Sequence, residues 1–199
     1  MVPSSSINLT PEEQARLISI ARESIRHGSV TKRPLQTDLY ALTGKLCEKL
    51  ASFVTLTQLG ELRGCVGSIE ATHPLGKCVS ISAFGAAYRD HRFAPLQHTE
   101  LEVTRVEISI LSRPETIVAS SPEELYQELR PGLDGIILEY SGHRVTFLPK
   151  VWVKLPEPKQ FVANLKTKAG LPTDFWSESI RYYRYQTQNF AEEATESIV

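Results

Sequence analysis

The sequence predicts an α+β fold with a mostly antiparallel sheet and flanking helices. Helical patterns gather in the first 90 residues, whereas strand patterns separated by turn residues dominate the middle of the chain. Strands and helices do not alternate in the way that is typical of a doubly wound parallel sheet. No repeat and no long Gly/Pro/Ser linker divides the chain, so we expect one domain over 10–190, a disordered lead at 1–9 and a frayed acidic tail at 191–199.

Three helices are predicted before residue 90. The first begins at Thr10, a good N-cap residue, and Glu13 completes the pattern of a capping box. We expect this helix to end near Gly28. Leucines at helical spacing predict a second, amphipathic helix over 39–50. The third helix, over about 74–88, is apolar nearly all round, which indicates that it is buried.

Runs of alternating and β-branched residues, bounded by turn residues, predict the strands. The predicted strands cover residues 53–57, 62–69, 103–111, 135–140, 144–148 and a Tyr-rich stretch near 181–185. The first two strands flank Gly60, and Ser141-Gly142 joins the fourth to the fifth, so both pairs are read as hairpins. Two further helices are predicted over 122–129 and 159–169.

Composition narrows the class of protein. A chain of 199 residues should bury roughly 70% of its unfolded surface, so we expect a fold that needs neither metal nor disulfide. The net charge of −1 gives no overall attraction to nucleic acid or to an anionic membrane. No signal peptide and no apolar run near ~20 residues is found. Three cysteines without CxxC spacing are typical of free thiols in a reducing compartment, which indicates a cytoplasmic protein.

The strand over 62–69 carries the best candidate for chemistry. Residues two apart in a strand share a face, so Arg63, Cys65 and Gly67 point one way and Gly64 the other. A cation beside a cysteine favours the thiolate, which is the nucleophilic form. Gly67 is expected to leave room for something to approach. The alternative is a small buried cysteine in a bulged strand, with Arg63 paired to a carboxylate.

A second candidate set follows the buried third helix. Asp90, His91 and Arg92 could bring polar groups toward Cys65, in the manner of a nucleophile, base and orienting acid. The alternative is that Asp90 and Arg92 form an ion pair that holds a loop.

Other chemistry finds less support in the sequence. The possible metal ligands Cys65, His73, His91 and His98 match no familiar zinc spacing, so no metal site is expected. Cys47 and Cys78 adjoin apolar stripes and are predicted to be core cysteines. No nucleotide-binding, hydrolase or zinc-protease string is present, and no cofactor is expected.

The segment 144–168 is rich in bases, and tyrosines follow it near 181–185. Such a surface could bind RNA or another anion by charge and stacking. The alternative is an ordinary solvated face.

Several motifs, taken together, resemble a known family. Leu62-Arg63-Gly64-Cys65-Val66-Gly67 closely resembles the LRGCIG signature of the AMMECR-type domain family, which is named after a human chromosomal region. The match continues in order through AYRDHRF at 87–93, EISIL at 107–111, GLDG at 132–135, TFLP at 146–149 and KAG at 168–170. The sequence at 149–156 is similar to that of the bacterial branch of the family, protein A of the AmmeMemoRadiSam system. His91 stands where the family often has proline.

This resemblance implies a two-lobed α+β fold within one compact unit, with the Arg-Gly-Cys motif near the groove between the lobes. It also implies a Memo-like protein and a radical SAM protein as partners, but it implies no particular reaction. Gly64, Gly67 and Thr146, which lie in family motifs, are the candidate binding residues.

Three functions follow as hypotheses. The first is a Cys65-dependent enzyme or modification factor that acts with partner proteins, in which Cys65 is the nucleophile or covalent carrier and Arg63 holds its thiolate or a substrate anion. The second is a non-catalytic adaptor that binds a partner protein in its groove. The third and weakest is an RNA-binding module that uses the segment 144–168.

Overall fold

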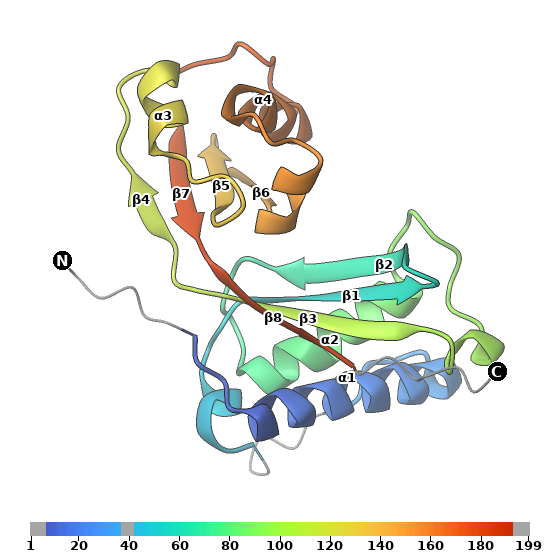
Figure 1. Cartoon of the computed structure of the whole chain (residues 1–199). Coiled ribbons are helices and arrows are strands. Elements are labelled where there is room, and N and C mark those ends of the chain that lie inside the picture. The colour runs from blue at the N-terminus through green and yellow to red at the C-terminus, as the bar shows by residue number, and fades with distance from the viewer. Residues whose placement is uncertain (1–6, 37–41, 193–199) are drawn as a thin grey trace. The chain divides into compact units, whose positions relative to one another are not determined.

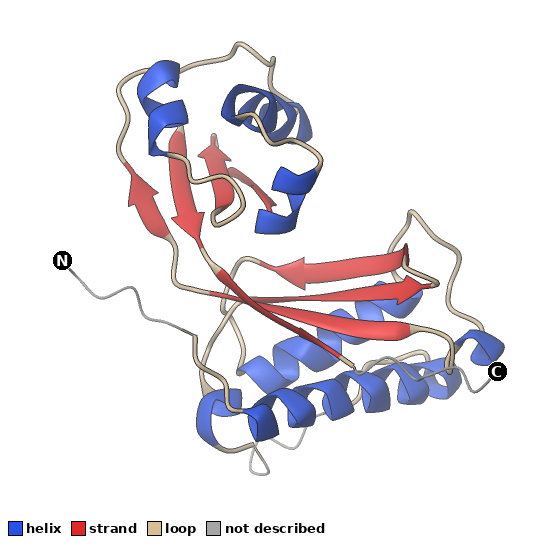
Figure 2. Cartoon of the chain, viewed as in Figure 1, coloured by secondary structure: helices blue, strands red, loops and turns tan. Residues whose placement is uncertain are grey.

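Two four-stranded antiparallel sheets organise the chain. The computed structural model describes residues 7–36 and 42–192 (Figure 1). It separates into two units, one formed by Met1–Leu111 with Gln188–Val199 and the other by Ser112–Thr187. Helices and antiparallel sheets in each unit confirm the predicted α+β class (Figure 2). No helix in the described ranges is long and apolar enough to cross a membrane.

The first unit is a sheet covered on one face by two helices (Figure 1). Its strand order is β2-β1-β3-β8, and Thr55 of the central strand β1 lies opposite Cys65 of the edge strand β2. The elements are α1 (Pro11–Thr31), the 3-10 turn η2 (Gly44–Cys47), β1 (Ser52–Gln58), β2 (Glu61–Ser68), α2 (Leu75–Tyr88), the 3-10 turn η3 (His98–Glu100), β3 (Arg105–Leu111) and β8 (Thr187–Ala191).

Helix α1 starts where the sequence predicts and ends later. Thr10 accepts a hydrogen bond from the Glu13 N–H, and the Glu13 carboxylate accepts one from the Thr10 N–H, so the capping box is complete. The helix does not end at Gly28, because Gly28 is a packing residue. A Cβ there would lie 2.5 Å from the ring of Phe84 in α2. The helix continues to Thr31, and Lys32 caps it in the left-handed conformation.

The helix predicted over 39–50 is wrong where the structure describes this segment. Residues 37–41 lie outside the described residues, and only Gly44–Cys47 forms a short 3-10 turn. Gly44, the first residue of this turn, has φ +55°, a left-handed conformation that the interior of an α-helix does not contain. Leu42 and Leu46 are nevertheless buried, so the leucine spacing marked core positions without marking a helix.

Close packing between α2 and β2 depends on two glycines. A Cβ on Gly64 would clash with the backbone carbonyl of Ala86 in α2, and a Cβ on Gly85 would lie 2.8 Å from the Val66 side chain. Each element therefore offers a glycine to the other, and the helix lies directly on the strand. Most residues of α2 are buried, whereas Ile81 is exposed and Lys77, Cys78 and Tyr88 are half-buried, which agrees with a largely buried helix.

The second unit contains the other sheet, with strand order β4-β7-β5-β6, and helices that pack on it (Figure 2). Its core brings Leu125 and Phe161 from two helices onto Ile136 of the sheet, and Trp152 stacks on Phe161 with ring centroids 3.7 Å apart. The elements are β4 (Glu115–Ile117), α3 (Pro122–Glu128), β5 (Gly135–Tyr140), β6 (His143–Phe147), the 3-10 turn η4 (Pro149–Val153), α4 (Pro158–Lys168) and β7 (Arg181–Tyr185).

Both predicted hairpins are present, but the sequence did not predict the short strands β4 and β8. The lead at 1–9 and the tail at 191–199 lie mostly outside the described residues. Within the described part, Leu9 is buried and its N–H donates to Gln188, while Ala191 ends β8.

Gly64→Ala should destabilise the first unit, because the added methyl group meets the rigid backbone of α2. We expect urea unfolding to show a loss of about 2 kcal/mol, the usual scale for overpacking a tight site. Glu61→Ala, at an exposed position in the same strand, is the control and should change stability little. Equal effects of the two substitutions would contradict the packing role of Gly64.

Candidate functional site

Arg63 is held by a carboxylate that the sequence analysis did not identify. Its guanidinium donates to Glu100 through Nε at 2.9 Å and Nη2 at 3.1 Å, and Gln58 adds a hydrogen bond to the same carboxylate at 3.0 Å. Arg63 lowers the pKa of Glu100 to about 2. The charge of Arg63 is therefore directed at Glu100, which agrees with the alternative in which this arginine pairs with a carboxylate.

Glu100 was missed because it is 37 residues away from Arg63 along the chain. The signal that could have found it is local. Gln97 and Glu100 form a reciprocal cap on the turn η3, in which the Gln97 N–H donates to Glu100 at 2.7 Å. A capping glutamate after the motif at 87–93 was a possible partner for a nearby arginine.

Hydrogen bonds to its backbone hold Cys65 in place. Its N–H donates to Asp90 Oδ2 at 2.8 Å, and its carbonyl accepts from Arg92 Nη2 at 3.4 Å. The thiol itself is half-buried and accepts a hydrogen bond from the Thr55 hydroxyl at 3.4 Å. Cys65 lies on an edge strand, so these side chains cover backbone groups that another strand would otherwise occupy.

Asp90 and Arg92 form a forked ion pair beside Cys65, with distances of 2.9 and 2.6 Å. This pair, together with the Cys65 N–H, holds the pKa of Asp90 far below its ordinary value. Hydrogen bonding to Asp90, and to a smaller degree the charge of Cys65, raises the pKa of Arg92. The ion-pair alternative for Asp90 and Arg92 is thus the arrangement observed. His91 is exposed and makes no described contact with Cys65 or Asp90.

The two glycines of the motif do not enclose free space. At Gly67 a Cβ would clash with the Ser52 carbonyl and would lie 2.5 Å from the Phe53 ring, so strand β1 occupies the room that was expected for a ligand. Gly64 faces α2 in the same way. Both residues therefore shape the sheet and the helix around Cys65.

Thr146 belongs to the second unit and is buried. Its hydroxyl donates to the Ile136 carbonyl at 2.9 Å and lies 2.8 Å from the Tyr185 hydroxyl. Tyr185 lies over Gly135, where a Cβ would clash with its ring. These contacts join three strands, which gives Thr146 a role in holding the sheet together.

The other two cysteines differ from the prediction. Cys47 is exposed, because the helix expected around it is absent, and Cys78 is half-buried. Burial raises the pKa of the Cys78 thiol, whose S–H donates to the His73 carbonyl at 3.4 Å. Within 7–36 and 42–192, no three His, Cys, Asp or Glu side chains converge as metal ligands would.

The bases of the segment 144–168 are partly used within the second unit. Arg144 pairs with Glu139 at 3.1 Å, and Lys168 donates to the Thr146 carbonyl at 2.9 Å. Lys166 is 1% exposed, and burial lowers its pKa. The continuous basic face that an RNA-binding surface needs is therefore interrupted at these positions.

Glu100→Gln should remove the acid-sensitive stabilisation that the Arg63 ion pair supplies. The folded pKa of Glu100 is about 2 against an ordinary value of 4.5, so this stabilisation is complete above pH 4.5 and is lost as the pH falls toward 2. Urea unfolding at pH 7 should show a loss of about 2 kcal/mol, and the difference from wild type should shrink below pH 4.

Glu102→Gln serves as the control, since Glu102 is exposed and its contact with Arg26 is 3.5 Å long. A constant difference between wild type and Glu100→Gln from pH 7 to pH 3 would contradict the assignment.

Comparison with known proteins places the chain in a family. A protein of Thermofilum pendens is 35% identical over 200 residues, covering 92% of both chains, and one of Methanothermobacter thermautotrophicus is 36% identical over 190 residues, covering 93% and 97%. The crystal structure of the uncharacterized protein PH0010 from Pyrococcus horikoshii is similar, with a TM-score of 0.82, 32% identity and coverage of 89% of this chain and 90% of that one. The AMMECR1 family profile matches residues 18–190, and the chain belongs to the AMMECR1 family.

Proposed function

We propose that this protein is a Cys65-dependent modification factor, with the thiol as nucleophile or covalent carrier. The observation that carries the proposal is the setting of the thiol. It is only half-buried, the Thr55 hydroxyl donates to it, and the Arg92 guanidinium reaches the carbonyl of the same residue at 3.4 Å. A hydroxyl donor and a nearby cation both stabilise a thiolate.

Arg92 replaces Arg63 as the supporting cation in this proposal. Arg63 is occupied by Glu100, whereas Arg92 is 57% exposed and keeps donors that Asp90 does not use. In the proposed step the thiolate sulfur forms a bond to an electrophilic carbon of the substrate. The leaving group departs with the electron pair of the bond that breaks, and the thiol proton has already passed to solvent.

We further propose that the protein acts with a Memo-like protein and a radical SAM protein, as part of the AmmeMemoRadiSam system. Support comes from the sequence at 149–156, which is similar to protein A of that system. The relatives compared above are archaeal. The described cysteines are free thiols, which supports a reducing compartment and thus a cytoplasmic location.

A non-catalytic adaptor is the second candidate. It is favoured by the extent to which the motif's polar groups already bind one another, since Arg63 is paired with Glu100 and Asp90 with Arg92. Such ion pairs hold a surface in shape without taking part in a reaction. In this case Cys65 would be a packing residue, and a partner protein would bind a surface that these pairs maintain.

The reactivity of the thiol separates the two candidates. In a Cys47→Ser background, which removes the exposed thiol, iodoacetamide at pH 7 should label Cys65 before Cys78, because burial raises the pKa of Cys78. Arg92→Ala should slow labelling of Cys65 by about threefold or more, since a supporting cation is lost. Peptide mass spectrometry after timed quenching measures both rates.

Arg113→Ala, at an exposed arginine of the second unit, is the matched control and should leave the rate unchanged. If Cys78 is labelled first, or if Cys65 is indifferent to Arg92, the nucleophile proposal fails and the adaptor is favoured.

A further inference from the structure

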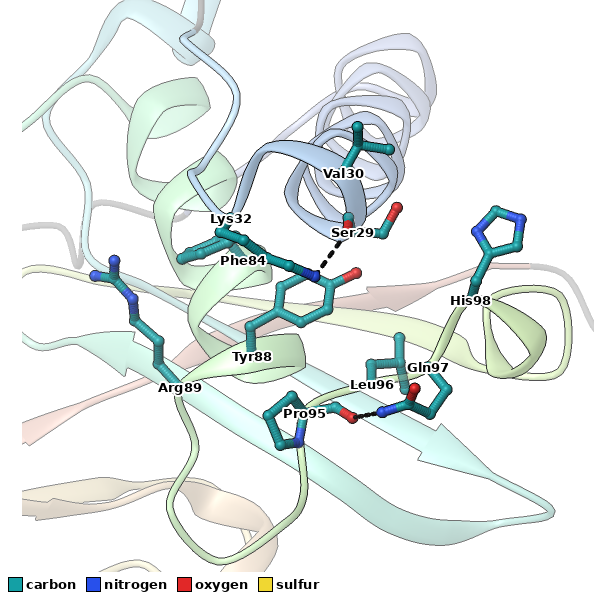
Figure 3. A pocket seen from close by; sticks show the side chains of 10 residues that line it. All are labelled: Ser29, Val30, Lys32, Phe84, Tyr88, Arg89, Pro95, Leu96, Gln97 and His98. Atoms are coloured by element: carbon teal, nitrogen blue, oxygen red, sulfur yellow. Dashed lines mark hydrogen bonds between the residues drawn. The ribbon is translucent and has the colours of Figure 1, made fainter.

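A cavity of about 520 Å³ opens in the first unit, where α1 and α2 end (Figure 3). Residues at the ends of α1 and α2 line two sides of the cavity. The segment after α2, which includes Leu96 and His98, lines the third side. The volume lies within the range of roughly 300–1,000 Å³ that is usual for small-molecule sites. None of its lining residues belongs to the Arg63–Cys65 motif or to the Asp90–Arg92 pair.

Aromatic rings give the cavity an apolar side. Phe84 and Tyr88 lie with ring centroids 5.3 Å apart, and both line the space (Figure 3). Gly28 allows this arrangement, since a Cβ there would meet both rings at 2.5–2.9 Å. The Tyr88 hydroxyl is turned to the protein, where it donates to the Ile25 carbonyl at 2.9 Å. The half-buried ring of Tyr88, backed by the buried ring of Phe84, therefore gives the cavity apolar surface that suits an aromatic or branched body.

The charged residues that line the cavity are all basic. Lys32 and Arg89 contribute full charges, His98 adds an imidazole, and no Asp or Glu is among the lining residues. Arg89 lies over the Phe84 ring at 4.9 Å and has no carboxylate partner in the described part of the chain. The lining of this cavity therefore carries positive charge and no negative charge.

Donors bind several carbonyls at the ends of the two helices and so weaken the negative helix C-termini beside the cavity. A helix C-terminus is negative where its last carbonyls lack donors. Here the Gly28 carbonyl accepts from the Lys32 N–H at 3.0 Å, the Ser29 carbonyl from Lys32 Nζ at 2.8 Å, and the Ala87 carbonyl from the Leu96 N–H at 2.8 Å. Lys32 uses one of its three ammonium donors in this way, and two remain for a ligand.

We propose that this cavity is a binding site for a small organic anion with an apolar or aromatic body. The body would lie against Phe84 and Tyr88, while the acidic group would bind Arg89 and Lys32. Arginine suits this role, because its planar guanidinium can donate two parallel hydrogen bonds to one carboxylate or sulfonate. The site is independent of the proposed thiol chemistry at Cys65.

The test uses two fluorescent probes that share a body and differ in charge. The probes are 1-anilinonaphthalene-8-sulfonate, an anion, and N-phenyl-1-naphthylamine, which lacks the sulfonate. The double variant Lys32→Asn/Arg89→Gln removes both cations, and asparagine tolerates the left-handed backbone of Lys32. We expect its affinity for the anionic probe to fall about tenfold, with little change for the neutral probe.

A control variant removes two charges elsewhere. Lys154→Gln/Lys159→Gln, at exposed positions of the second unit, has the same net charge and should bind both probes as wild type does. The probe is located by methyl NMR, in which the signals of Val30 and Leu96 should shift on titration. If the double variant does not fold, as judged by circular dichroism, the single variant Arg89→Gln replaces it, with an expected loss of about threefold.

Three results would overturn the proposal. They are an absence of binding by the anionic probe, an equal loss of affinity in the control variant, and methyl shifts confined to the second unit.

Discussion

One segment is held against the edge strand β2 by a carboxylate at each of its ends, and one of these carboxylates covers a backbone group of that edge. Asp90 binds the outward N–H of Cys65, and Glu100 binds the Arg63 side chain two residues away. An uncovered edge strand would expose unpaired backbone groups to other chains. Because both anchors lie in β2, the segment 90–100 is held to the sheet at each end. Its middle is then placed against α2, where Leu96 binds the Ala87 carbonyl.

This arrangement divides the Arg-Gly-Cys motif into two functions. Backbone groups and the guanidinium of Arg63 serve structure, whereas the thiol of Cys65 meets only the Thr55 hydroxyl among the described hydrogen bonds. Arg92 holds the pKa of Asp90 so low that this carboxylate stays ionised and is a poor general base at neutral pH. The proposed thiol chemistry at Cys65 therefore depends on a neighbouring cation and not on a base within a triad.

The proposed anion site and the thiol lie on different elements. Leu96 and His98 line the cavity from the segment 90–100, which Asp90 and Glu100 hold to the sheet, whereas Cys65 lies on strand β2. Glycines set the distances at both places. Gly64 brings α2 onto β2, and Gly28 brings Phe84 and Tyr88 against α1. At both places the lack of a side chain on glycine lets the helices pack closely.

Local pattern in the sequence determined the α+β class, the start of α1 and the two hairpins, because caps, turns and strand alternation act between near neighbours. The helix predicted over 39–50 failed because leucine spacing reports burial and not backbone conformation, and Gly44 decides the latter. Only the tertiary structure decided that Arg63 pairs with Glu100, that β1 fills the space at Gly67, and that basic residues gather where α1 and α2 end. These contacts join residues far apart in the chain, and packing alone brings them together.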